Sequence, residues 1–145
     1  MINNIPATNK TSVKSKFRGV TPDNAFALVM YARKGLKPKV FYDFAAAINM
    51  TEKRLAGIIN LSARTLSNYQ AQQKTLEPIY SEHLLKLIAL YEKGEAIFGN
   101  IDEFNYWLKK PLWNTEETPL DWLETPGGVD IIAEEIDRLA YAYPI

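Results

Sequence analysis

The sequence predicts an all-α protein, with an N-terminal helix-turn-helix bundle followed by a small helical domain. Apolar residues recur at helical spacing along most of the chain, and no stretch of it reads as a convincing strand. Signals for helix starts and ends, such as Thr21-Pro22 and Gly99-Asn100, divide these patterns into short helices. With 145 residues, 47% of them hydrophobic, the chain is long enough for one or two small domains with buried cores.

The start of the chain is polar and basic, with Lys10, Lys14, Lys16 and Arg18 set among asparagine, serine and threonine. Burial of so few apolar groups does not offset the conformational entropy lost on folding. We therefore expect a flexible basic arm over residues 1–20.

Two helices are expected next. Thr21 is the predicted N-cap of the first, whose apolar stripe is Phe26, Val29 and Met30 and whose end is marked by Gly35. The second helix runs from near Pro38 to Asn49. Its inward-facing residues are predicted to be Phe41, Phe44, Ala45 and Ile48.

Residues 52–74 have the spacing of a helix-turn-helix motif. The first helix is capped by Thr51, and Asn60 occupies the turn position that requires a left-handed backbone. The second helix begins at Ser62 or Ala63. The residues of the two helices expected to face inward are Leu55, Ala56, Ile59, Leu66 and Tyr69.

The outward face of the second helix is small or polar and has no carboxylate. A helix that enters the major groove needs donors and acceptors for base edges and positive charge for phosphates. We therefore predict a DNA-binding domain over residues 21–79, the plainer alternative being an amphipathic helix pair in a helical core. The residues expected at base edges are Arg64, Ser67, Asn68 and Gln72, and those expected at phosphates are Lys53, Arg54 and Lys74.

The net charge of zero hides a strong division along the chain. Residues 1–76 contain 12 lysines and arginines against three carboxylates, a net charge of +9. Residues 77–145 contain five basic residues against 14 acidic ones, a net charge of −9. The basic part suits a polyanion, and the acidic part suits a protein with a basic surface.

Residues 80–145 are predicted to form the second domain, joined to the first by a helix over residues 80–98. Apolar residues surround this joining helix, which indicates burial from several sides, either within one chain or between chains. We expect the single histidine, His83, to be an ordinary solvated residue. The elements expected after it are a short helix over 102–109, a turn from Thr118-Pro119 to Leu123, a break at Gly127-Gly128 and a closing helix.

Composition argues against an enzyme, a metal site, a bound cofactor and a membrane span. The chain has no cysteine and one histidine, which leaves little for zinc or a histidine-based triad. Glu116-Glu117 and Glu134-Glu135 are adjacent pairs, so their members do not face each other on a helix. The chain also lacks a run of apolar residues of membrane-spanning length and the apolar segment of a signal peptide, so we expect a cytoplasmic protein.

Beside the helix-turn-helix, the second domain carries a series of short motifs. A helix ends in Ile97-Phe98-Gly99, a Trp107-Leu108 helix is followed by Pro111, and Thr118-Pro119-Leu120 opens a turn before the break at 125–128. With these motifs the chain resembles antitoxins of the Xre/MbcA/ParS family over roughly residues 36–145. It departs from the family pattern in the loop over 111–117 and in a bulkier C-terminal tail.

The resemblance implies a partner and a role. The implied partner is a toxin with a RES domain, an NAD-consuming enzyme that the antitoxin neutralises by direct binding. The implied role includes repression of the shared operon through the helix-turn-helix. Because one helix-turn-helix reads only a few base pairs, we also expect a homodimer or a larger assembly with the toxin.

Toxin-binding residues are predicted in a loop and at the C-terminus. Trp113 lies in the loop, outside the helical spacing of the predicted core residues. Large aromatic side chains are common anchors of interfaces. The tail residues Tyr141, Tyr143, Pro144 and Ile145 either block the toxin's active-site cleft, as the resemblance suggests, or fold back on their own helix.

Two other functions remain open at this stage. One is a stand-alone helix-turn-helix regulator whose C-terminal domain dimerises or senses a ligand. The other is a plasmid-partition or stability factor, which shares the fold.

Overall fold

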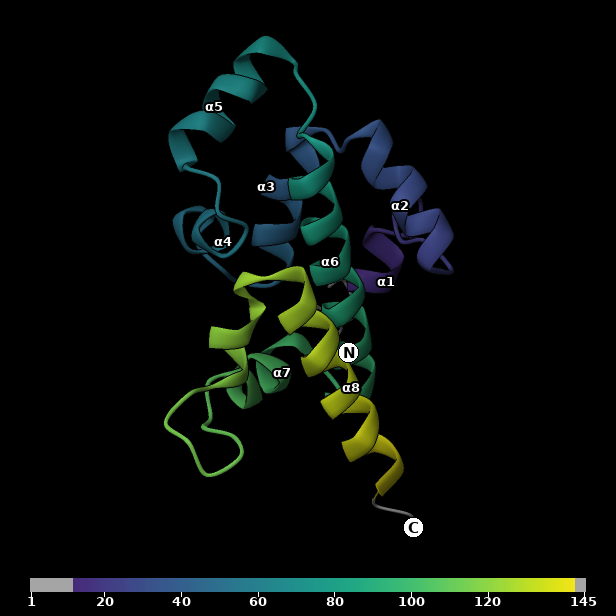
Figure 1. The fold of residues 1–145 in the computed structure, drawn as a ribbon, viewed down its shortest axis with the longest axis vertical. Helices are drawn as coiled ribbons and strands as arrows, with labels where there is room; N and C mark the ends of the chain where they lie inside the picture. The colour runs from purple at the N-terminus through teal and green to yellow at the C-terminus, as the bar shows by residue number, and fades with distance from the viewer. Residues whose placement is uncertain (1–11, 143–145) are drawn as a thin grey trace, which may run out of the picture.

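The computed structural model describes residues 12–142, so predictions for residues 1–11 and 143–145 lie outside it. The described residues form α-helices and one 3-10 helix and contain no strand, which confirms the predicted all-α class (Figure 1). The elements are α1 Val13–Lys16, α2 Ala25–Lys34, α3 Pro38–Ala47, α4 Glu52–Ile58, α5 Ala63–Gln72, α6 Pro78–Phe98, α7 Ile101–Leu108, η2 Pro119–Glu124 and α8 Pro126–Ala142.

The long helix α6 is the centre of the molecule, and α1, α2, α7 and α8 all pack on it (Figure 1). Its apolar side chains face several neighbours at once, which confirms burial from several sides. These side chains are used inside the chain's own core. The fully buried ones are Leu84, Leu85, Leu87, Ile88, Leu90 and Tyr91.

Residues 13–17 correct, for their part of residues 1–20, the prediction of a flexible arm. Val13 and Phe17, four residues apart on one side of α1, are buried in the core. The Phe17 ring stands edge-on to Phe44 with centroids 5.8 Å apart, and the Val13 amide donates to a Glu95 carboxylate oxygen at 2.8 Å. Two apolar residues with correct spacing are therefore enough to attach this basic segment to α6.

Helix α2 starts later than predicted and packs on a different face. Its N-cap is Asn24, whose side chain accepts from the Ala27 amide at 2.8 Å, whereas the Thr21 hydroxyl donates to the Phe17 carbonyl oxygen. The predicted apolar stripe, Phe26, Val29 and Met30, is exposed. The helix packs on the core through Ala32 and Leu28, because a small residue allows close approach to α6.

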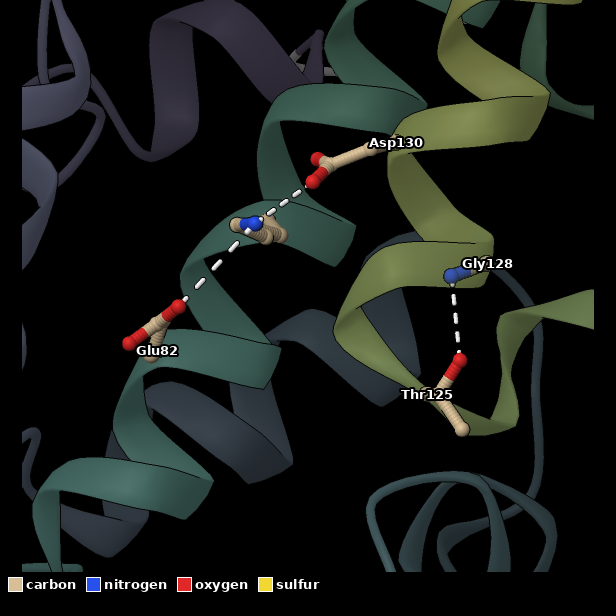
Figure 2. Close-up of polar contacts among 5 residues, drawn as sticks. Glu82, Thr125, Gly128 and Asp130 are labelled. Atoms are coloured by element: carbon tan, nitrogen blue, oxygen red, sulfur yellow. Dashed lines mark hydrogen bonds and ion pairs between the residues drawn. The ribbon is translucent and has the colours of Figure 1, made fainter.

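Helices α6 and α8 run parallel and are joined by two ion pairs in the same register. Lys86 Nζ lies 2.7 Å from Asp130 Oδ2, and Lys93 Nζ lies 2.8 Å from Asp137 Oδ2. Each pair is two helical turns from the other on both helices. The Lys86 ammonium also lies 4.0 Å from a Glu82 carboxylate oxygen, so it sits between two carboxylates. Figure 2 shows Glu82 and Asp130 with the dashed lines that mark these two contacts.

The two glycines predicted to break the chain before the last helix lie instead inside the first turn of α8. The Thr125 hydroxyl oxygen accepts from the Gly128 amide at 3.0 Å, as Figure 2 shows. A Cβ at Gly128 would overlap the Trp122 carbonyl oxygen. Gly128 is therefore required for the close approach of α8 to η2, not for a break.

Side-chain amides connect the first half of the chain to the second, and a buried histidine joins α6 to η2 within the second half. The Asn105 amide donates to the Ile48 carbonyl oxygen at 2.9 Å, and the Asn60 amide donates to the Glu124 carbonyl oxygen at 3.1 Å. His83 is 3% exposed, with Nε2 2.7 Å from the Leu123 carbonyl oxygen, so the prediction of a solvated histidine is wrong. Burial lowers the pKa of the His83 imidazole, although the hydrogen bond to Leu123 acts in the opposite direction.

Candidate functional site

The helix-turn-helix forms from α4 and α5 with the caps that the sequence indicated. The Thr51 hydroxyl accepts from the Arg54 amide at 3.1 Å, and the Ser62 hydroxyl accepts from the Thr65 amide at 3.0 Å. Asn60 has φ +63°, the left-handed turn conformation expected of it. Four predicted inward residues, Leu55, Ala56, Ile59 and Leu66, are buried, and Tyr69 is half-buried against the core.

All the residues predicted to contact DNA are exposed on this motif. Arg64, Ser67, Asn68 and Gln72 lie along α5, Lys53 and Arg54 lie on α4, and Lys74 follows α5. No ion pair to a carboxylate holds these cations among the described residues. They are available to an anion such as a DNA phosphate.

Lys74 is positioned by an aromatic ring. Its ammonium lies 4.5 Å from the centroid of Tyr69, whose hydroxyl donates to a Glu77 carboxylate oxygen at 2.6 Å. This hydrogen bond raises the pKa of the Tyr69 hydroxyl and lowers that of the Glu77 carboxyl. The contact fixes the cation at the end of α5 without burying it.

A further cation comes from the second half of the chain. Lys109, next to the end of α7, lines an open hollow of about 260 Å³ together with Arg54 and Thr51 of the α4 segment. Sequence reasoning did not place Lys109 near DNA-facing residues, because only the fold brings α7 beside α4. The available signal was a Lys109-Lys110 pair in an otherwise acidic region.

The loop between α7 and η2 presents an aromatic side chain on a strained backbone. Trp113 is 44% exposed and its ring stands edge-on to Trp122, with centroids 5.2 Å apart. Trp113 and Asn114 have φ values of +53° and +59°, a left-handed conformation that asparagine tolerates and that is costly for a bulky residue such as tryptophan. The Thr115 hydroxyl donates to the Leu112 carbonyl oxygen at 2.8 Å and closes the loop. Surrounding structure therefore holds Trp113 outward.

The end of α8 carries another exposed aromatic, Tyr141, with 84% of its surface accessible. The other predicted tail residues, Tyr143, Pro144 and Ile145, lie outside the described residues. Figure 1 shows α5 at one end of the long axis of the molecule, and the loop over 111–118 and the end of α8 toward the other. The α5 face is thus well separated from this loop and from the end of α8.

Two family descriptions match consecutive parts of the chain. The antitoxin Xre-like helix-turn-helix domain matches residues 27–89, and the antitoxin Xre/MbcA/ParS C-terminal toxin-binding domain matches residues 93–142. The chain belongs to the Xre/MbcA/ParS antitoxin family. The resemblance noted in the sequence is therefore confirmed. No curated protein gives a match to this antitoxin.

The matched ranges divide the antitoxin within α6. The helix-turn-helix match extends to residue 89, so it includes the first half of the helix that we assigned to the second domain. Since α6 packs on both halves, it serves as the common core of the two domains.

In the described part of the antitoxin no helix is long and apolar enough to cross a membrane. Residues 12–142 also contain no cluster of three or more histidine and carboxylate side chains with the geometry of a metal site.

Proposed function

We propose that this antitoxin neutralises a RES-type, NAD-consuming toxin through its C-terminal domain and represses its own operon through the helix-turn-helix. The observation that supports the proposal most strongly is the order of the two family matches, an antitoxin helix-turn-helix followed by a toxin-binding domain. The protein acts by binding and not by catalysis.

For DNA, the support is the exposed, acid-free face of α5. In this proposal Arg64, Ser67, Asn68 and Gln72 contact base edges, and Lys53, Arg54 and Lys74 contact phosphates. The operator is read by two copies on a symmetric site, since one motif covers only a few base pairs. Operator binding places the working protein in the cytoplasm.

For the toxin, the support is the exposed aromatic surface at the opposite end. Trp113 and Tyr141 provide large apolar area with polar groups at the ring edge. The tail residues Tyr143, Pro144 and Ile145 enter the toxin's active-site cleft and block access of the dinucleotide. Because this surface is remote from α5, toxin and operator bind to one antitoxin at the same time.

The proposal is tested by separating the two activities in cells that express the adjacent toxin gene. Arg64→Ala with Asn68→Ala is expected to release the operon promoter and still protect cell growth and cellular NAD. Trp113→Ala combined with deletion of residues 143–145 is expected to do the reverse. Circular dichroism of each variant checks that it is folded.

Two results would contradict the proposal. If the tail and Trp113 variant protects cells as well as the wild type, the assigned toxin surface is wrong. If no toxin is neutralised while a promoter is repressed, the protein is instead a regulator whose second domain has another role.

A further inference from the structure

Helix α2 has an apolar face that no part of the described chain covers. Phe26 is 76% exposed, and Val29 and Met30, one turn further along, are also exposed. The spacing i, i+3, i+4 puts the three side chains on one stripe. Exposed stripes of this kind on a folded domain mark interaction sites more often than chance.

An apolar groove lies directly beside this stripe. It has a volume of about 350 Å³, with Ala89 and Leu90 of α6 as its floor. Leu28 and Val29 of α2 form one wall, and Val129 and Ala133 of α8 form the other. Val29 belongs to both features, so a protruding phenylalanine and a hollow share one continuous surface.

A surface with both a projection and a hollow is complementary to itself. In a two-fold dimer each copy offers the same patch, so the projecting Phe26 of one copy would meet the groove of the other. The charges on the groove rim do not oppose this, because they are paired within the chain: Lys86 with Asp130 and, at 4.0 Å, with Glu82, and Lys93 with Asp137.

The ends of α2 carry opposite charges. Asp23 precedes the helix, and Arg33 and Lys34 form its last turn. Within residues 12–142 none of the three takes part in an ion pair. Antiparallel packing of two α2 helices about a two-fold axis would set Asp23 of each copy opposite Arg33 and Lys34 of the other.

We infer that the α2 face is the self-association surface of this protein and that its occupant is α2 of a second copy. The inference deepens the proposed function, since it rests on a two-fold repressor and names the surface that forms it. Such a dimer leaves α5, Trp113 and the end of α8 uncovered, because α2 lies on the other side of α6 from α4 (Figure 1).

The test is sedimentation equilibrium of the full chain, without toxin or DNA, over about 1–100 µM, a range that covers weak interfaces of modest area. The wild type is expected to dimerise. Phe26→Glu is expected to raise the dimer dissociation constant by about 100-fold or more, because each dimer loses two central contacts. Tyr106→Glu, at an exposed aromatic on α7, is the matched control and is expected to leave the dissociation constant unchanged.

Charge reversal tests the antiparallel arrangement. Asp23→Lys is expected to weaken the dimer about tenfold, and adding Arg33→Glu and Lys34→Glu to it is expected to restore the wild-type dissociation constant. Within one chain, each of the three charge reversals is unfavourable for the α2 helix dipole. A restored dissociation constant can therefore arise only from contacts between two chains.

A wild type that stays monomeric across the range would overturn the inference. So would a Phe26→Glu protein that dimerises normally and instead fails to bind the toxin, since the occupant of the patch would then be the toxin. A monomeric Phe26→Glu protein that still neutralises the toxin supports the inference and leaves the proposed toxin surface to its own test.

Discussion

The most discriminating test of the packing is the substitution Gly94→Ala in the last two turns of α6. Alanine is favoured over glycine in a helix by about 0.8–1.0 kcal/mol, so without tertiary contacts this change would stabilise the protein. A Cβ at Gly94, however, would overlap three atoms of the Phe104 ring. The sign of the effect therefore depends on whether that ring is able to move.

Phe104 has little freedom to move. It is fully buried, and its centroid lies 5.0 Å from that of Tyr91, 5.5 Å from that of Phe98 and 6.1 Å from that of Trp107. Overpacking of such a site costs about 1–3 kcal/mol, and a ring held on all sides places the cost near 3. We expect a net loss of about 2 kcal/mol, equivalent to a fall in Tm of about 4–8 °C for a chain of this size.

Urea denaturation followed by far-ultraviolet circular dichroism measures this loss. Gly57→Ala in α4 is the matched control, because its Cβ would meet no atom within 4 Å. We expect that control to raise the free energy of unfolding by about 0.5–1 kcal/mol. Adding Phe104→Leu to Gly94→Ala should cost less than the sum of the two single changes. If Gly94→Ala is neutral or stabilising, the close approach of α6 and α7 does not require glycine at position 94.

Three further outcomes are expected. Below the ordinary pKa of histidine, 6.5, unfolded chains take up a proton that His83 in the folded chain resists. Stability is therefore complete above that pH and falls below it by at most about 1.4 kcal/mol per pH unit; urea titrations at several pH values should show this slope in the wild type and not in His83→Gln. Arg64→Ala should weaken operator binding by about 1–3 kcal/mol in a gel-shift titration if Arg64 makes a bidentate base contact. Lys109→Ala should leave base preference unchanged and reduce the dependence of operator affinity on salt by about one phosphate contact.

Each of these three predictions would be contradicted by a specific result. Equal pH slopes in the wild type and His83→Gln would mean that the histidine does not resist protonation. An operator affinity unaffected by Arg64→Ala together with Asn68→Ala would remove α5 from the base edges. An unchanged salt slope for Lys109→Ala would confine phosphate contacts to the first half of the chain, with Lys110→Ala as the neighbouring control.

The sequence alone determined the helix-turn-helix, because its signals are local. The caps Thr51 and Ser62, the left-handed Asn60 and the buried Leu55 and Leu66 all depend on neighbours within one or two turns. The burial of α6 was also predictable, since a helix with apolar residues on every side has few alternatives.

Only the tertiary structure decided which helix faces are packed and which polar side chains are paired within the chain. Sequence periodicity favoured the stripe of Phe26, Val29 and Met30 in α2, but the face that packs is the one where Ala32 allows close approach to α6, and Phe26 is left outside. His83 appears solvated in the sequence because its acceptor is the Leu123 carbonyl oxygen, 40 residues away. The pairing of Lys86 and Lys93 with Asp130 and Asp137 likewise exists only when α6 and α8 lie parallel in one register. Local patterns record what each residue prefers, whereas the choice among several acceptable faces depends on fits between helices that are distant in the chain.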